Sequence, residues 1–399
     1  MSKRPDGQPK KVAVIYHYFA HYRQPVVDEL INNSKHHYEF LAGTNNFGTG
    51  IKLIEHFPDN RFRHAKCLLF GPLLFQWRAI TAALGTRYDT LILLGNCRWP
   101  TTWLAAIFAR IRGKQVLFWS HGWIKKESGL KGWLRNTFFK IGHGILLYGH
   151  RAKCIGIQNG FNPEKLHVIY NSLDCKLQDD TIKKLGPNDR DQTREKLFGQ
   201  DAKNAILVNV TRLHHHKKID MLINVAAMLN ERSVPVNVLI VGEGPHKPEL
   251  EKLAKDKNVN TVFTGALYDE LEIGRMLNAS DIAVMPGPVG LLAMHTLAYG
   301  VPVISNNHFD TQMPEFEAIQ PDITGDFFEN DNLNSLALSI QKMLKNQHQF
   351  DQRRKKTREV IERFYNPTSE RILIDRAVDG HIADDRFNAS LGSYKSNQS

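Results

Sequence analysis

Short apolar segments alternate with amphipathic ones along most of this 399-residue chain. In the first half, strands are predicted at residues 11–16, 38–43, 89–95, 115–120 and 144–149, and the segment 166–174 ends this half. Helical spacing fills the intervals between several of these strands. Near-continuous apolar strands that alternate with helices are typical of a parallel sheet covered on both faces. The first half therefore predicts an α/β domain.

The same alternation restarts after a charged, strand-free stretch. Further strands are predicted at residues 205–210, 236–242, 261–265, 281–286 and 302–305. From this pattern we expect a first domain at 1–185, a linker with one short helix at 186–204, a second domain at 205–365, a helix returning to the first domain at 366–385, and a disordered tail at 386–399. Ligands of doubly wound sheets bind beyond the carboxyl ends of the strands, so the loops there are the candidate site.

Composition limits the classes of partner. Lys and Arg number 52 against 41 Asp and Glu, and the formal net charge of +11 favours an anionic partner. A phosphorylated substrate, an anionic membrane surface and nucleic acid all fit that charge, but no nucleic-acid-binding motif is present, so no nucleic acid is expected. The four cysteines form no C-x-x-C pair, which argues against a disulfide scaffold or a zinc site.

The first residues are polar and lead directly into a strand, so no signal peptide is expected. The longest apolar runs are shorter than the ~20 residues of a membrane-spanning helix. These features predict a cytoplasmic protein, either free or peripheral on the inner face of the cell membrane.

Basic residues stand at one strand-to-helix turn, in the stretch N-V-T-R-L-H-H-H-K-K. Arg212 and Lys217 suit a diphosphate, because a guanidinium fork and an ammonium are joined there by a helix N-terminus. A solvated basic turn fits the same spacing equally well. Three consecutive histidines, His214–His216, cannot all face one ion, and no carboxylate or cysteine adjoins them in the sequence, so no metal is assigned.

Glycine-rich loops follow three other strands. Glu243, in V-G-E-G-P, can accept a hydrogen bond from a ligand hydroxyl, and backbone groups at Gly265 and Leu267 can read a nucleobase edge. The loop G-P-V-G opens a helix, which presents backbone amides to an anion; its candidate residues are Gly287, Val289, Gly290 and Leu291. Tight structural turns explain each of these loops as well.

Four motifs occur in a fixed order: R-L-x-x-x-K, V-G-x-G-P, F-x-G, and a glycine-rich loop followed by L-A-Y-G-V-P-V-I. In this order they resemble the donor-binding domain of retaining family 4 glycosyltransferases, over roughly residues 200–325. The resemblance implies the GT-B fold, in which two doubly wound Rossmann-like domains face each other across a cleft. F-W-S-H-G and P-E-K-L-H-V-I-Y-N-S-L-D in the first half are similar, more loosely, to the family's acceptor domain.

The resemblance implies roles for individual residues. Arg212 and Lys217 match the pair that grips the donor diphosphate, and His121 matches a histidine near the reacting sugar. Arg23 lies in a basic, tyrosine-rich loop where many members have glycines, and it is expected to bind substrate. Asn171 matches the asparagine that closes the first domain, where a hinge or capping role is an equal alternative. Glu315 matches a P-E turn near the donor, where a surface turn is an equal alternative.

This chain departs from the family at the glycine-rich loop. Most members carry two glutamates there, separated by seven residues, and the corresponding positions are Gly287 and His295. The first glutamate usually contacts the donor sugar and the second the ribose. His295 can still hydrogen-bond a ribose hydroxyl, whereas Gly287 offers only its backbone.

The resemblance implies transfer of a sugar from a nucleoside-diphosphate sugar to a glycan or lipid-linked glycan, with retention, without a metal and without a cofactor other than the nucleotide-sugar co-substrate. Cell-surface polysaccharide or glycoconjugate biosynthesis is the expected setting. Two alternatives stay open: a sugar-nucleotide epimerase, for which no acid/base carboxylates are identified, and a non-catalytic homologue that binds sugar nucleotides. The segment K-G-W-L-R-N-T-F-F-K-I-G-H-G predicts a helix that lies either on an anionic bilayer or half-buried against the sheet.

Overall fold

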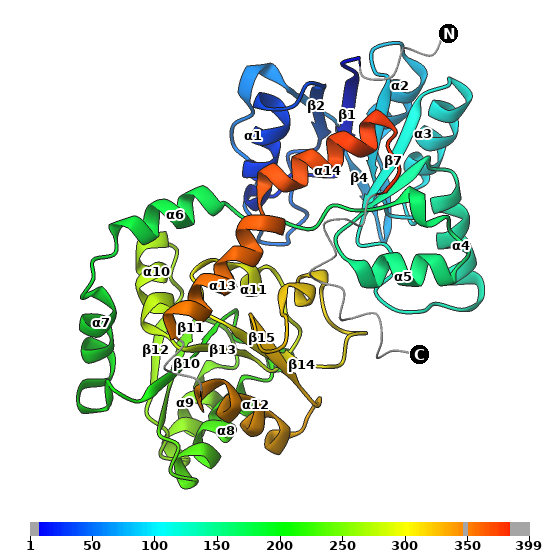
Figure 1. The fold of residues 1–399 in the computed structure, drawn as a ribbon. Coiled ribbons are helices and arrows are strands. Elements are labelled where there is room, and N and C mark those ends of the chain that lie inside the picture. The colour runs from blue at the N-terminus through cyan, green and yellow to red at the C-terminus, as the bar shows by residue number, and fades with distance from the viewer. Residues whose placement is uncertain (1–7, 346–349, 384–399) are drawn as a thin grey trace. The chain divides into compact units, whose positions relative to one another are not determined.

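The computed structural model describes residues 8–345 and 350–383. The chain divides into two compact units: the first comprises the residues up to Leu173 together with those from Asn366 onward, and the second is Asp174–Tyr365 (Figure 1). The tail predicted at 386–399 lies outside the described residues.

The first unit contains a seven-stranded sheet in the order β3-β2-β1-β6-β7-β8-β9, and every neighbouring pair of strands in it is parallel. Its strands are β1 (Lys11–Ile15), β2 (His37–Ala42), β3 (Phe62–His64), β6 (Thr90–Leu94), β7 (Gln115–Ser120), β8 (Gly144–Leu147) and β9 (Leu166–Val168). A separate antiparallel hairpin joins β4 (Leu68–Phe70) to β5 (Leu73–Phe75). The helices are α1 (Gln24–Asn32), α2 (Trp77–Leu84), α3 (Pro100–Ile111), α4 (Gly129–Lys140), α5 (His150–Gln158) and α14 (Pro367–Asp379).

Strand residues of the first unit are buried on both sides, as a parallel sheet requires. Ala13 and Ile15 share one core with α2, α3, α4 and α5, whereas their neighbours Val12 and Val14 point to the opposite face and are also fully buried. Both faces of the sheet are therefore covered.

The second unit contains a six-stranded parallel sheet in the order β12-β11-β10-β13-β14-β15. Its strands are β10 (Ala205–Val210), β11 (Val236–Val241), β12 (Thr261–Gly265), β13 (Ile282–Met285), β14 (Val303–Asn306) and β15 (Gly325–Phe328). Its helices are α6 (Cys175–Lys184), α7 (Asp189–Phe198), α8 (Ile219–Glu231), α9 (Lys247–Asp256), α10 (Glu270–Ala279), α11 (Leu291–Ala298), α12 (Leu333–Lys345) and α13 (Phe350–Phe364).

The core of the second unit lies between the sheet and the helices α8, α9 and α12. Leu222, Leu250 and Ile340, one from each helix, belong to a single apolar cluster with alternate residues of the strands. The two units therefore have separate cores, each built around its own parallel sheet.

The division of the chain differs from the one expected at residues 185 and 204. The segment 186–204 belongs to the second unit, because the side chain of Arg194 on α7 is buried there and bonds to the carbonyl oxygens of Ala202, Asn204 and Ala279. The helix expected at 366–385 is α14, and it belongs to the first unit. Among the described helices, none is both long enough and apolar enough to cross a membrane.

Candidate functional site

The strand order of the second unit reverses between β10 and β13. Ligands of open α/β sheets bind beyond the carboxyl ends of the strands at such a switch point. Two loops leave the sheet here: residues 211–218, which we call the Lys217 loop, and residues 286–290, which we call the glycine loop. Both loops line a cavity of about 200 Å³; Asn209, Thr211, Lys217, Gly287, Pro288, Gly290 and Leu291 are among the lining residues.

Lys217 brings a positive charge to this cavity. Its Nζ donates a hydrogen bond to the carbonyl oxygen of Pro288 at 2.9 Å, and burial lowers its pKa from the ordinary lysine value. The backbone carbonyl oxygen of Lys217 in turn accepts a bond from the amide of Gly287 at 3.0 Å. An ammonium held in a partly buried position interacts more strongly with an anion than one in open water.

Gly287 permits the close approach of the two loops. A Cβ atom at this position would lie 2.7 Å from the Cα of Lys217 and 2.6 Å from the carbonyl oxygen of His216. Real side chains do not tolerate such distances, so a larger residue would force the loops apart. Gly287 thus allows the close approach that fixes the position of Lys217.

Backbone amides are presented to the cavity by the start of α11. Gly290 precedes the helix and provides no side-chain cap, and the first amides of a helix have no acceptor within the helix. Buried side chains hold the loop before it: Gln312 accepts from the amide of Val289 at 2.7 Å, and Asn306 donates to the carbonyl oxygen of Pro286 at 2.7 Å. Together with Lys217, these amides form a site suited to a phosphate group.

Arg212 lies in the same loop but does not line the cavity. Its side chain is exposed, and it forms no hydrogen bond or ion pair within the part of the chain that the structure describes. Arg212 and Lys217 therefore lie in one loop, but only Lys217 lines the cavity.

Asn209 is a polar residue of this cavity that no motif of the sequence indicated. It is 2% exposed, its Nδ2 donates to the carbonyl oxygen of Val284 at 2.7 Å, and its Oδ1 has no hydrogen-bond partner among the described residues. An unpaired buried amide oxygen is costly unless a ligand or water pairs with it. The one available signal was a polar residue inside the apolar strand A-I-L-V-N-V.

His295 is engaged by a carboxylate. Its Nε2 lies 2.8 Å from Oε1 of Glu270, at the start of α10, and the hydroxyl of Tyr299 donates to the same oxygen at 2.7 Å. Burial opposes ionisation of Glu270, but hydrogen bonds from His295 and Tyr299 outweigh it and lower its pKa below the ordinary value. A carboxylate absent from the helix sequence is thus supplied by the neighbouring helix.

The residue predicted to bind a ligand hydroxyl, Glu243, and those predicted to contact the base, Gly265 and Leu267, lie around the ends of β11 and β12. Glu243 is half exposed and pairs with Nζ of Lys247 at 2.6 Å, so its carboxylate is not free. The amide of Gly242 donates to the carbonyl oxygen of Gly265 at 2.8 Å, which joins the two strand ends, and Leu267 follows in a partly buried position.

Glu315 lies in the short 3-10 helix Pro314–Ala318 and is only 3% exposed. A surface turn is therefore wrong for this residue. The preceding residue, Met313, donates its amide to the carbonyl oxygen of Val289 at 3.3 Å, so this turn packs against the glycine loop.

In the first unit, Arg23 lies within a cage of aromatic rings. Its guanidinium carbon is 5.0 Å from the ring centre of Tyr16, 5.1 Å from that of Trp119 and 5.8 Å from that of Tyr148. It also donates a hydrogen bond to the hydroxyl of Tyr148. Cation–π contacts of this kind hold the charge in place at the carboxyl ends of β1, β7 and β8.

His121 adjoins this cage, with its ring centre 4.8 Å from that of Tyr148. Burial and the charge of Arg23 lower the pKa of His121 to about 4, so its imidazole is neutral near pH 7. Its buried Nδ1 has no hydrogen-bond partner in the described part of the chain. His17, the second residue after β1, likewise has a buried Nδ1 without a partner among the described residues, and burial and the charge of Arg23 lower its pKa to about 4. Only its place after a strand distinguished it in the sequence.

Asn171 lies in the segment that leads out of the first unit. Its Oδ1 accepts a hydrogen bond from the amide of the next residue, Ser172, at 3.0 Å. The hydroxyl of Ser172 donates to Glu370 on α14.

The acidic pair Asp189 and Asp191 lies in the first turn of α7. The residue between them, Arg190, pairs with Asp281 at 2.6 Å, and Arg194 pairs with the other oxygen of Asp281 at 3.0 Å. Asp281 directly precedes β13 and also accepts from the amide of Ile206 at 2.7 Å. This network holds α7 against the sheet.

Residues 189–362 match the family model of glycosyl transferases group 1. Most of the second unit is therefore similar to group 1 glycosyl transferases. A GDP-mannose-dependent alpha-(1-6)-phosphatidylinositol dimannoside mannosyltransferase of Mycobacterium tuberculosis is 34% identical over 102 residues, which are 25% of this chain and 26% of that protein. A GDP-mannose-dependent monoacylated alpha-(1-6)-phosphatidylinositol monomannoside mannosyltransferase of Corynebacterium glutamicum is 32% identical over 218 residues, 52% of this chain and 56% of that protein. The chain thus spans about a quarter of the first relative and about half of the second.

A solved structure extends the likeness to both units. The Anabaena protein Alr3699/HepE in complex with UDP superposes with a TM-score of 0.67 at 14% identity, covering 93% of this chain and all of that one. This likeness, together with the two parallel sheets, shows the GT-B fold. The matched residues 189–362 include both the loops that line the cavity at the switch point and the His295–Glu270 pair.

Proposed function

We propose that this protein transfers a sugar from a nucleoside-diphosphate sugar to a glycan or lipid-linked glycan acceptor in glycoconjugate biosynthesis. The observation that carries the proposal is the position of Lys217, which lines a cavity at the switch point of a group 1 glycosyl transferase domain. The relatives from Mycobacterium and Corynebacterium are named as mannosyltransferases that depend on GDP-mannose.

In the proposed reaction, departure of the nucleoside diphosphate is assisted by positive groups. Lys217 and the first amides of α11 stabilise the charge that develops on the leaving diphosphate, and Arg212 approaches it from the solvent side of the same loop. The transition state has oxocarbenium character, as in other glycosyl transfers. We propose that no catalytic metal is needed, because the positive groups already supply the charge. We also propose retention of configuration, as the resemblance to retaining glycosyltransferases implies.

We propose that the His295–Glu270 pair binds the ribose. Leu291 lines the cavity, and His295 follows one helical turn later on the same face of α11. Oε1 of Glu270 accepts bonds from His295 and Tyr299, which leaves Oε2 to accept from a ribose hydroxyl. The carboxylate that most family members carry on the helix is in this way replaced by one from α10.

For the acceptor we propose the residues around Arg23 and His121 in the first unit. An uncharged imidazole can accept a hydrogen bond from an acceptor hydroxyl, and the caged guanidinium can bind an anionic group on the acceptor. The lowered pKa of His121 favours the neutral form that this role requires.

We further propose that the first unit attaches to the inner face of a membrane. The hairpin β4–β5 exposes Leu69 and Phe70, which are 47% and 64% exposed, and Lys66 and Arg78 lie on either side of it. Apolar residues flanked by basic ones suit an anionic bilayer. Helix α4 is half buried through Phe138 and Phe139, and its exposed residues Leu130 and Trp133 form a second candidate contact.

A thermal-shift screen with UDP, GDP and their sugars tests the proposed function, because a ligand that binds the folded state raises the melting temperature. We expect one nucleotide and its sugar to raise it, and NMR of that sugar nucleotide with candidate acceptors to show transfer. A new epimer formed from the donor alone would identify an epimerase instead. Binding without turnover would identify a non-catalytic homologue, and no shift with any nucleotide would contradict the proposal.

A further inference from the structure

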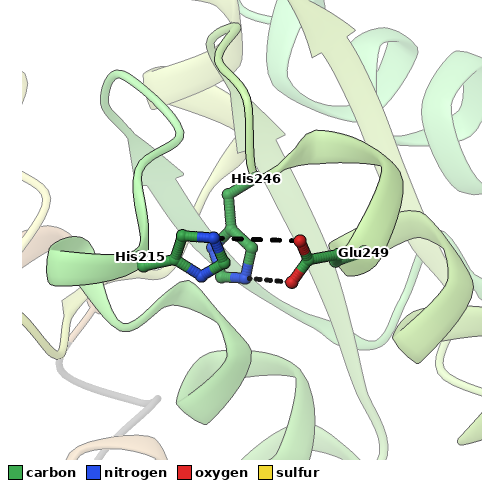
Figure 2. A group of neighbouring side chains, drawn as sticks. All are labelled: His215, His246 and Glu249. Atoms are coloured by element: carbon green, nitrogen blue, oxygen red, sulfur yellow. Dashed lines mark ion pairs between the residues drawn. The ribbon is translucent and has the colours of Figure 1, made fainter.

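Side chains from two segments that are distant in the sequence meet at the Lys217 loop (Figure 2). They are His215, at the start of the 3-10 helix His215–Lys217, His246, which precedes α9, and Glu249 in the first turn of α9. We call them the His215 cluster. The two imidazole rings lie 3.9 Å apart between centres, and the Glu249 carboxylate faces both of them.

The distances within the cluster fit a shared ion better than direct bonds. Nε2 of His215 is 3.8 Å from Oε1 of Glu249, and Nε2 of His246 is 3.6 Å from Oε2. These separations exceed the ~2.7–3.2 Å of a nitrogen–oxygen hydrogen bond. Two ligands of one tetrahedral zinc ion, with bonds of about 2.0–2.1 Å, lie about 3.3 Å apart. A small closure of the cluster would therefore give a coordinated ion its ordinary bond lengths.

The imidazole of His246 is buried and incompletely paired. It is 5% exposed, and its Nδ1 is buried without a hydrogen-bond partner among the described residues. Its Nε2 is too far from Glu249 for a strong hydrogen bond. A neutral imidazole nitrogen is an ordinary zinc ligand.

We propose that His215, His246 and Glu249 bind one divalent transition-metal ion, with zinc as the best match. Two imidazoles and one carboxylate are a recurrent zinc ligand set, and a water molecule would complete the tetrahedron. The consecutive histidines of the sequence led us to expect no metal, but only one of them belongs to the cluster, and the fold supplies the carboxylate that the neighbouring sequence lacks.

The proposed ion has a structural role. Hydrogen bonds already join the Lys217 loop to the segment before α9. The backbone amide of His246 donates to the carbonyl oxygen of Leu213 at 3.1 Å, and the amide of Leu213 donates to the carbonyl oxygen of Glu243 at 3.0 Å. A metal bound by His215 and His246 adds a side-chain link to this backbone pairing. It would hold the 3-10 helix that ends at Lys217, and it requires no part in sugar transfer.

Zinc titration of the full chain, purified without a polyhistidine tag and stripped with a chelator, tests the proposal. We expect calorimetry to give one zinc ion per chain, Co²⁺ to give the visible spectrum of a tetrahedral complex, and zinc to raise the melting temperature. His215→Ala and Glu249→Gln change exposed side chains, so they should fold normally and bind zinc at least about tenfold more weakly.

His216→Ala is the matched control, because this neighbour is also exposed and lies outside the cluster. It should bind zinc as the unmodified chain does. Equal weakening in His216→Ala and His215→Ala would show non-specific binding by the histidine run and overturn the proposal. Unchanged binding in both His215→Ala and Glu249→Gln, or no stoichiometric binding by the unmodified chain, would overturn it as well.

Discussion

Nε2 of His295 lies 2.8 Å from Oε1 of Glu270, so a histidine on α11 and a carboxylate at the start of α10 act as one polar unit. The acid comes from α10 and lies beside the histidine of α11. It places a negative charge near this turn of α11. If the pair binds ribose as proposed, removal of the Glu270 carboxylate should weaken only ligands that carry the ribose hydroxyls.

Glu270→Gln should weaken binding of the nucleotide found in the screen by about 3- to 30-fold, because a charged acceptor becomes a neutral one. Calorimetry should show a smaller loss for the 2′-deoxy nucleotide and none for inorganic diphosphate. Glu272→Gln, two residues later on the same helix and half exposed, is the control. An equal loss for the ribo and deoxy nucleotides would contradict a ribose contact.

Lys217→Ala should reduce nucleotide binding by about 10- to 100-fold, because it removes a charged donor from the proposed diphosphate site. The same loss should appear with inorganic diphosphate, which distinguishes this residue from Glu270. Lys252→Ala, which removes an exposed lysine from α9, keeps the net charge equal to that of the test variant. Wild-type affinity in Lys217→Ala would refute the diphosphate assignment.

Gly287→Ala should destabilise the second unit by about 1–3 kcal/mol, because its Cβ would meet the backbone of Lys217. Thermal unfolding should show a lower melting temperature, and nucleotide affinity should fall with it. Gly290→Ala is a matched control in the same loop, since a Cβ there meets no atom within 4 Å. Equal melting temperatures for the two variants would show that the two loops can move apart without a loss of stability.

Burial raises the pKa of Glu370 to about 7, although its bond from Ser172 and the charge of Arg23 oppose that rise. An unfolded glutamate has a pKa of about 4.3, so between these values the folded carboxyl keeps a proton that the unfolded chain has lost. The stabilisation of the folded state by this carboxyl is thus fully present below about pH 4.3. As the pH rises to about 7, the free energy of unfolding falls by up to about 3 kcal/mol for this group.

Glu370→Gln should remove this dependence, since the amide oxygen can still accept from Ser172. The melting temperature of the variant relative to the unmodified protein should rise from about pH 5 to about pH 8. Parallel melting profiles across that range would show that the carboxyl does not titrate there. The buried histidines are present in both Glu370→Gln and the unmodified protein, so their titration does not affect the difference between the two melting temperatures.

Phe70→Ser should lower retention on anionic liposomes at low salt by roughly tenfold, as expected for the loss of one inserted aromatic side chain. Trp133→Ser tests α4 in the same way, and Ile111→Ser removes an apolar side chain that is 75% exposed elsewhere in the first unit. Failure of the unmodified protein to bind such liposomes would reject the membrane proposal.

The apolar strands were predictable because a buried parallel strand must be apolar on both faces. Residues 205–210 and 115–120 coincide with β10 and β7, for example. The short strands β3 and β15 contain charged residues and follow no such pattern. Helix α6 was not predicted, because its sequence is a charged stretch. Asp174 caps this helix by accepting a hydrogen bond from the amide of Leu177 at 2.9 Å.

The site was predictable only as far as loops and strand order determine it. The order of the motifs places Lys217 and the glycine loop at adjacent strand ends, and the cavity lies there. The pairing of His295 with Glu270 depends on how α10 and α11 pack, and the His215 cluster depends on the approach of α9 to the Lys217 loop. Such contacts are set by three-dimensional packing and leave no periodic signal in the chain.

The first unit is not continuous in the sequence, because α14 returns to it after the whole of the second unit. The hydroxyl of Tyr38 donates to Oδ1 of Asp375 at 2.8 Å, and the side-chain Nε2 of Gln115 donates to the carbonyl oxygen of Ala377 at 2.8 Å. During synthesis, a ribosome therefore completes the second unit while the first still exposes the face that α14 will cover. The nascent chain must keep that face from premature association until its last helix emerges, and a chain released after Tyr365 would never cover it.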